Sequence, residues 1–261
     1  MANTYFQFKQ FTVHQEHSAM KVCTDACLFG AWVAKDEAIV TANSILDIGT
    51  GTGLLSLMLA QATAHSISPA QIMAIEIEES AANEAASNFA LSPWNDRLIV
   101  KHSSIQAYSD TDNITVSEFV NNKNVIKQFD CIITNPPFFE GDLQSPDTNK
   151  NLASHSTALP WSALINEVNG LLKTDGCYYV IIPALRAYTM QKLATQNGIQ
   201  LAEEVVVFNA AKQKPFRVFQ KYIKNNNLIS DIQRSNLIIK DLENKYTDDF
   251  VNLLKDYYLH L

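Results

Sequence analysis

The sequence predicts a doubly wound α/β protein: one sheet of seven strands, mostly parallel, with helices on both faces and an antiparallel hairpin at one edge. Three observations support this. Strand-like and helix-like segments alternate from residue 44 to residue 196, as in parallel strands joined by crossover helices. A glycine-rich turn joins the first strand to the first helix. Two β-rich runs then follow with no helix between them, which is typical of an antiparallel pair.

The first half of the sheet is predicted from short apolar runs, most of them followed by a helical pattern. Ser44–Ile48 is a strand that ends at the glycine-rich turn, and Leu54–Ala62 carries apolar residues at helical density. Ile72–Ile77 is the second strand, and the alanine-rich segment Glu79–Ala90 is the second helix. Leu98–Val100 is the third strand.

The second half of the sheet follows a polar stretch, 109–128, that we expect to be a variable connection. Phe129–Thr134 is the fourth strand and Cys177–Ile182 is the fifth. Between them, residues 142–157 are polar and aperiodic, which predicts a loop. The remaining elements are a helix at Ser162–Leu172, a helix at Leu185–Gln196, strands at Leu201–Phe208 and Arg217–Ile223, and a final helix capped by Thr247.

A length of 261 residues predicts a single domain with one main core. Residues 44–224 form that core. Residues 1–43 add an N-terminal hairpin and helix, and residues 225–261 add a C-terminal extension with the terminal helix.

The composition excludes several classes of protein. With 47% hydrophobic and 18% charged residues the chain is neither disordered nor fibrous, and no apolar run reaches the roughly 18 residues of a membrane helix. The N-terminus lacks the basic and apolar regions of a secretion signal. The four cysteines form no C-x-x-C pair and no cluster at zinc spacing. We therefore expect a cytoplasmic protein with no membrane segment and no metal.

The glycine-rich turn, D-I-G-T-G-T-G at residues 47–53, is the sharpest local signal. Glycines let the backbone approach a ligand, and the following helix offers free N–H groups, so a nucleotide-like ligand is predicted. A dinucleotide fingerprint needs glycine where this chain has Leu54. Glu76, near the end of the second strand, can accept hydrogen bonds from two ribose hydroxyls. A tight turn with a purely structural role is the alternative.

A second signal, N-P-P-F at residues 135–138, follows the fourth strand. Its prolines fix the backbone, so the nearby carbonyls point in set directions. The Asn135 side-chain oxygen and the Pro136 carbonyl can accept both hydrogens of a planar amino group, while Phe138 offers a face for a flipped base. The alternative is a proline-stiffened loop with a buried phenylalanine.

One basic segment interrupts a chain whose formal net charge is −7. It contains no acid and interleaves its cations with aromatic residues, which favours a local nucleic-acid contact. A strand with solvated lysines is the alternative. The cations are Lys212, Lys214, Arg217, Lys221 and Lys224.

Together these motifs resemble class I S-adenosylmethionine-dependent methyltransferases, which have a Rossmann-like sheet, and N-P-P-F resembles the acceptor motif of those that methylate planar amino nitrogens. The segment K-V-C-T-D-A-C-L-F-G-A-W at residues 21–32 narrows the resemblance to the bacterial tRNA(Val) adenine-N6 methyltransferase family. The aromatic end, Tyr257 and Tyr258, is similar to that family as well.

The resemblance implies a site for S-adenosyl-L-methionine. The chain departs from the family in two places: Cys23 stands where the family has glycine, and Ser103 and Ser104 stand where related enzymes place an acid toward the cofactor's adenine. That contact is then expected from the backbone at Ser104 and Ile105. The implied cofactor residues are Thr24, Asp25, Asp47, Gly49, Gly51, Gly53, Glu76, Ile77, Ser104, Ile105 and Asn135, and the implied catalytic residues are Asn135, Pro136, Pro137 and Phe138.

The resemblance implies methyl transfer to the N6 of an adenine in the anticodon loop of a tRNA, with tRNA-Val the expected species and a monomer the expected state. Alternatives with the same fold and cofactor are methylation of a guanine N2 in ribosomal RNA, of DNA adenine N6, or of a protein glutamine amide, because N-P-P-F alone does not exclude them. A non-catalytic RNA chaperone and a nicotinamide oxidoreductase are disfavoured by Asn135 and Leu54, respectively.

Overall fold

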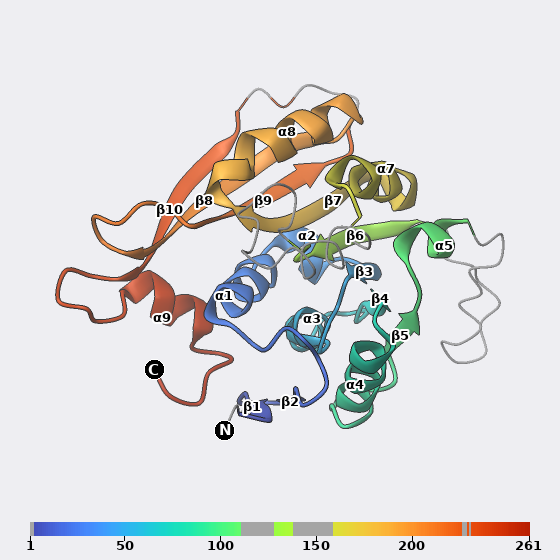
Figure 1. Ribbon diagram of the computed structural model, residues 1–261, viewed down its shortest axis with the longest axis horizontal. Helices are drawn as coiled ribbons and strands as arrows, with labels where there is room; N and C mark the ends of the chain where they lie inside the picture. Colours follow the sequence, from blue (N-terminus) through green and yellow to red (C-terminus); the bar gives the residue numbers. More distant parts are fainter. Residues whose placement is uncertain (1–2, 111–127, 138–158, 226–228, 230) are drawn as a thin grey trace, which may run out of the picture.

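The computed structural model describes residues 3–110, 128–137, 159–225, 229 and 231–261. The strands of its main sheet are β3 (Ser44–Ile48), β4 (Gln71–Glu76), β5 (Leu98–His102), β6 (Phe129–Thr134), β7 (Leu172–Pro183), β8 (Gln200–Ala210), β9 (Arg217–Ile223) and β10 (Gln233–Lys240). Their order is β10-β8-β9-β7-β6-β3-β4-β5, and β9 is antiparallel to both of its neighbours while the other pairs are parallel (Figure 1). The doubly wound α/β fold is therefore confirmed.

Helices cover the sheet on both faces. Buried side chains of one set of helices share a core with one face, and those of the other set share a second core with the opposite face. Figure 1 shows the resulting layers, with α8 above the upper strands and α1 and α9 below them. The first set is α1 (Thr24–Val33), α2 (Glu37–Val40), α3 (Leu54–Ala62), α4 (Glu79–Ala90) and α9 (Asp248–Leu254); the second is α5 (Ile105–Ser109), α7 (Trp161–Leu171) and α8 (Ala187–Gln196).

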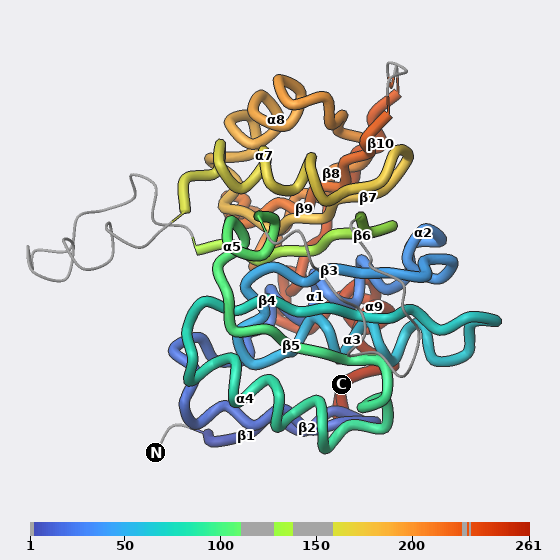
Figure 2. The backbone as a smooth tube through the Cα atoms, turned by 90° about the vertical axis from the view of Figure 1, so that its right-hand side faces the viewer, coloured from blue at the N-terminus to red at the C-terminus, as the bar shows by residue number. Residues whose placement is uncertain are grey.

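The N-terminal hairpin packs against both α4 and the end of the chain. Its strands are β1 (Tyr5–Gln7) and β2 (Thr12–His14), which pair antiparallel. The Lys9 N–H donates to the Tyr257 carbonyl at 2.8 Å. Figure 2 shows the hairpin beside α4. The two terminal extensions therefore contact each other as well as the core.

The predicted strand number of seven is wrong, because the described part of the main sheet has eight strands. The extra strand, β10, lies in the predicted C-terminal extension and pairs in parallel with β8. It therefore takes the edge position that we expected the β8–β9 pair to occupy. The first half of β10 is polar and exposed, and only Leu237 and Ile239 are buried, so its sequence lacks the apolar alternation of a half-buried strand.

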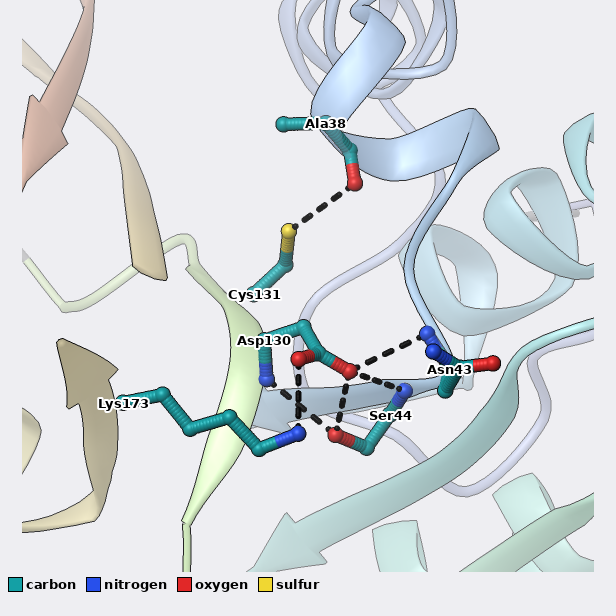
Figure 3. Close-up of polar contacts among 6 residues, drawn as sticks. All are labelled: Ala38, Asn43, Ser44, Asp130, Cys131 and Lys173. Carbon is teal, nitrogen blue, oxygen red and sulfur yellow. Dashed lines mark hydrogen bonds and ion pairs between the residues drawn. The ribbon is translucent and has the colours of Figure 1, made fainter. Parts of the chain in front are cut away.

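Asp130 joins the amino ends of three strands of the sheet (Figure 3). Its Oδ2 accepts hydrogen bonds from the backbone N–H groups of Asn43 and Ser44 at 3.0 and 2.9 Å, and from the Ser44 hydroxyl at 2.9 Å. Its Oδ1 pairs with Lys173 Nζ at 2.6 Å. Burial raises the pKa of Asp130, but the hydrogen bonds from Lys173 and Ser44 outweigh it and hold the pKa below its ordinary value.

Replacing Asp130 with alanine is expected to lower the free energy of unfolding by about 1–3 kcal/mol, because partly buried donors lose their acceptor. The same depressed pKa means that this stabilisation is present near neutral pH and is lost as the pH falls through the folded pKa. Glu243→Ala is the control, since its ion pair with Lys245 is exposed on both sides and worth little. Urea unfolding of both variants checks this, and equal effects would contradict it.

Candidate functional site

Three strands bring the predicted motifs together at the carboxyl edge of the sheet. Ile48, the last residue of β3, lies opposite Ile75 of β4 and opposite Thr134 of β6. The Thr134 hydroxyl donates to the Ile48 carbonyl at 2.7 Å, which ties the ends of β3 and β6 together. The glycine-rich turn, Glu76 and Asn135 therefore follow adjacent strand ends, as ligand sites do in open α/β sheets.

The glycine-rich turn uses backbone conformations that favour glycine. Gly49, Gly51 and Gly53 have φ values of +70°, +56° and +86°. A Cβ on Gly53 would lie 2.5 Å from the Phe89 ring, so Gly53 also permits close packing of the turn on α4. A Cβ on Gly51 would instead enter open space, with Ser18 Oγ the nearest atom at 3.9 Å. A Cβ on Gly49 would have no atom within 4 Å, so the backbone of the turn lies open to a ligand at both Gly49 and Gly51.

Asp47 is the first residue of the glycine-rich turn and is completely buried. Its Oδ2 accepts hydrogen bonds from the hydroxyls of Thr50 at 2.6 Å and Ser56 at 2.7 Å. Its Oδ1 has no hydrogen-bond partner among the described residues. Burial raises the pKa of Asp47 to about 6, against the opposing effect of the two hydroxyls.

Stability is expected to depend on the charge of Asp47. Because the folded pKa lies above the ordinary value of 3.8, the carboxyl group favours the folded state most below pH 4, and that advantage is lost as the pH rises through 6. The shift from 3.8 to about 6 corresponds to about 3 kcal/mol. The free energy of unfolding of Asp47→Asn, relative to that of the wild type, should therefore increase by up to that amount between pH 4 and pH 8. Urea unfolding at both pH values measures it, and a pH-independent difference would contradict the assignment.

Glu76 is held in place by backbone N–H groups. Its Oε1 accepts from Ile77 at 2.8 Å and Glu78 at 3.0 Å, and its Oε2 accepts from Gly51 at 2.8 Å. A carboxylate accepts about four hydrogen bonds, so about one position on Oε2 is left for a ligand hydroxyl. The carboxylate is therefore oriented toward the glycine-rich turn, with less free capacity than the two ribose contacts expected from the sequence.

Asn135 follows β6 with its side-chain oxygen buried. That oxygen, Oδ1, has no hydrogen-bond partner within the described part of the chain. Pro136 is buried and Pro137 is exposed. Phe138 lies outside the described residues, so its expected stacking role stays a prediction. A buried acceptor without a donor is costly, and a bound donor would satisfy it.

The segment before α1 borders the glycine-rich turn, which the sequence did not indicate. The buried Glu84 carboxylate accepts from the N–H groups of His17 and Ser18, both at 2.9 Å. The fully buried Asn88 side chain donates to the carbonyls of His14 and Thr52 at 2.9 and 2.8 Å. These two residues of α4 thereby fix Ser18 beside Gly51. In the sequence, the sign of this contact is that two polar residues, Glu84 and Asn88, stand within an alanine-rich helix.

Thr24 and Asp25 begin α1, and their side chains contact other parts of the protein. Asp25 Oδ2 pairs with Arg217 Nε at 2.9 Å. The Thr24 hydroxyl is hydrogen-bonded to the Tyr258 hydroxyl. Asp25, expected at the cofactor, and Arg217, expected at RNA, are thus partners of each other.

The five cations of the basic segment do not form one exposed surface. Lys221 Nζ pairs with Asp36 at 2.6 Å, and both side chains are largely buried. Lys224 Nζ donates to two backbone carbonyls, at 2.6 and 2.9 Å. Lys212 and Lys214 are exposed in the β8–β9 turn. The structure therefore leaves these two lysines as the accessible cations of the segment.

The residues expected near the cofactor's adenine lie at the ends of β4 and β5. Ile77 is 55% exposed directly after β4, so it offers an apolar surface there. The Ser104 hydroxyl accepts from the Ala107 N–H at 3.2 Å and caps α5, while Ile105 is buried. Ile77 is thus the exposed apolar residue of this group.

Neither a metal-binding cluster nor a membrane-spanning helix occurs in the described part of the chain. It contains no group of three or more His, Cys, Asp or Glu residues arranged to hold a metal ion. None of its helices has the length and apolar character needed to cross a membrane.

The sequence matches known methyltransferases. Residues 31–220 match the family model "Methyltransferase small domain". The chain is 39% identical to the tRNA1(Val) (adenine(37)-N6)-methyltransferase of Cytophaga hutchinsonii, with 100% of both chains covered. It is 37% identical to the protein of the same name from Dyadobacter fermentans, with 98% of both covered, and 36% identical to that of Bacteroides thetaiotaomicron, with 100% of both covered.

Solved structures share the fold. A predicted O-methyltransferase of Agrobacterium tumefaciens has a TM-score of 0.60 at 16% identity, over 88% of this chain and 95% of that one. A 16S rRNA N2 methyltransferase of T. Thermophilus, in complex with AdoMet and guanosine, has a TM-score of 0.51 at 18% identity, over 84% of this chain and 49% of that one. At these identities the likeness concerns the fold alone.

Proposed function

This chain belongs to the methyltransferase small domain family and, within it, to the tRNA1(Val) (adenine(37)-N6)-methyltransferases, and we propose that it methylates the exocyclic N6 of an adenine in the anticodon loop of a tRNA. The observation that carries the proposal is the buried Asn135 Oδ1, which has no hydrogen-bond partner among the described residues and lies at the carboxyl edge of the sheet, beside the glycine-rich turn. A bound amino group would donate the hydrogen bond that this oxygen does not receive from the described residues.

Asn135 and Pro136 would hold the target amino group. Asn135 Oδ1 accepts one hydrogen of the N6 amino group and the Pro136 carbonyl accepts the other, so both hydrogens are fixed and the nitrogen lone pair is directed to one side. Positioning of this kind can contribute roughly 7–11 kcal/mol to lowering a barrier. The proton leaves after transfer, when the nitrogen is cationic and acidic, so the step places no demand for a strong base on the protein.

The residues present fit S-adenosyl-L-methionine, which supplies a reactive methyl group when it is bound. Gly51 leaves open space where a Cβ would lie, Glu76 Oε2 retains capacity for a hydroxyl, and Asp47 Oδ1 is a buried acceptor without a partner among the described residues. We assign Gly49, Gly51 and Gly53 to the backbone contact, Glu76 to the ribose and Ile77 to the adenine. The N-terminal extension, residues 1–43, would close this pocket through Ser18.

Lys212 and Lys214 are our candidates for phosphate contacts, because they are the exposed cations of the basic segment. Arg217, Lys221 and Lys224 would act indirectly, by fixing β9 to α1, α2 and the α7–β7 junction.

Transfer of labelled methyl groups to tRNA, ribosomal RNA, DNA and protein tests the proposal. We expect label in tRNA alone, and we expect tRNA from cells lacking the protein to have lost one N6-methyladenosine by mass spectrometry. An unchanged tRNA profile together with a missing methyl group in ribosomal RNA, DNA or protein would assign the enzyme to that acceptor instead.

A further inference from the structure

Two large apolar side chains are exposed just past the carboxyl end of β7. Leu185, in the short 3-10 helix η2 (Ala184–Arg186), is 92% exposed, and Tyr188, in the first turn of α8, is 77% exposed. They are three residues apart in consecutive helical turns, so they lie near each other. Exposed apolar side chains that gather in one place mark interaction sites more often than scattered ones do.

The end of the β8–β9 turn lies beside Ala184, the residue before Leu185. The Ala184 N–H donates to the Phe216 carbonyl at 3.2 Å, and Pro183 lies opposite Arg217 in the β7–β9 pair. The turn contains Lys212 and Lys214, which are exposed and make no ion pair within the described ranges. We call Leu185, Tyr188, Lys212 and Lys214 the β7 corner.

The β7 corner is on the same edge of the sheet as Asn135. β6 and β7 are parallel, and β7 and β8 are both antiparallel to β9, so all three carboxyl ends meet at one edge. β7 is the neighbour of β6 and continues for three residues past Val180, which lies opposite Thr134 at the end of β6, so the two strand ends are roughly 11 Å apart. β8 is three strands from β6, at a lateral distance of about 14 Å. A polymer that delivers one group to Asn135 would therefore extend over the corner.

Resting on the proposed function, we propose that the β7 corner binds the unpaired RNA next to the target adenine, with a base stacked on Tyr188 and in apolar contact with Leu185, and with phosphates at Lys212 and Lys214. Aromatic faces beside cations are the chemistry of single-stranded nucleic-acid binding. The charges favour this occupant over a second copy of the chain. In a two-fold interface centred on the corner, each copy would face a patch of the same positive charge, which offers the lysines no complementary partner.

Binding of purified total tRNA to the full-length protein tests the base contacts. The double variant Leu185→Ala, Tyr188→Ala should raise the Kd by about 5- to 150-fold, the range expected for the loss of one stacking contact, that of Tyr188, with unchanged cofactor affinity. Tyr188→Trp keeps an aromatic face and should bind like wild type. Ile67→Ala is the matched control, since Ile67 is fully exposed but precedes β4 at the opposite edge of the sheet, and its Kd should not change.

Salt dependence tests the phosphate contacts separately. Replacing Lys212 and Lys214 with alanine should flatten the log–log salt slope of tRNA binding by about 1.4, at 0.7 per contact on single strands. The double apolar variant should keep the wild-type slope, because it removes no charge.

The outcomes separate this inference from the proposed function. If the wild type methylates tRNA and the double apolar variant binds tRNA at the wild-type Kd, the β7 corner does not bind the RNA, and the proposed function still holds. A wild type that neither binds nor methylates tRNA overturns both. A dimer in sedimentation experiments that the double apolar variant converts to monomer, with unchanged tRNA binding, would make the corner a self-interface instead.

Discussion

Asn135→Ala is expected to lower kcat by about 10²–10³-fold while leaving cofactor affinity nearly unchanged. The lost hydrogen bond matters most as the nitrogen lone pair develops toward the methyl group, and loss of one preorganised contact in other enzymes has an effect of this size. Because Asn135 Oδ1 lacks a partner among the described residues, its removal breaks no hydrogen bond described in the fold. Folding should therefore be preserved.

Single-turnover kinetics with saturating cofactor and tRNA measure this effect. Asn135→Asp is the informative companion variant, since it keeps an acceptor oxygen but adds a charge, and it should lie between alanine and wild type. Normal turnover of Asn135→Ala on every acceptor tried would remove Asn135 from the mechanism, whatever the substrate is.

Gly51→Val should abolish detectable cofactor binding in calorimetry. Its Cβ would enter the open space beside Ser18, and the branched side chain would fill that space further. The positive φ of +56° also strains any side chain there by roughly 1–2 kcal/mol, so stability alone does not identify the site.

Gly198→Val is the control that separates backbone strain at a positive φ from steric blocking of the cofactor site. Gly198 has a φ of +76° and nothing within 4 Å of its Cβ position, and it lies at the end of α8, away from the glycine-rich turn. Both variants should lose similar stability, and Gly198→Val should bind the cofactor normally. Cofactor binding by Gly51→Val at wild-type affinity would place the ligand elsewhere.

The sequence by itself determined the core of the fold and the position of the motifs. The predicted bounds are correct for β3, α3, α4 and β6. In each of these elements the spacing of the apolar residues matches the period of the strand or helix that buries them, and turn residues mark its ends. Since parallel strands share one carboxyl edge, the sequence places the glycine-rich turn, Glu76 and Asn135 at that edge. The tertiary structure decided that β6 lies beside β3, although β4 and β5 come between them in the chain, and so brought Asn135 next to the turn.

Only the tertiary structure decided which polar side chains are free to meet a ligand. Asp25 and Arg217 are 192 residues apart in sequence and neutralise each other, and Lys221 pairs with Asp36 of another element. A charge count along the chain cannot show such pairs, because a cation's availability depends on what the fold packs against it. The edge strand β10 was likewise decided by pairing with β8, since an exposed polar strand carries little apolar signal of its own.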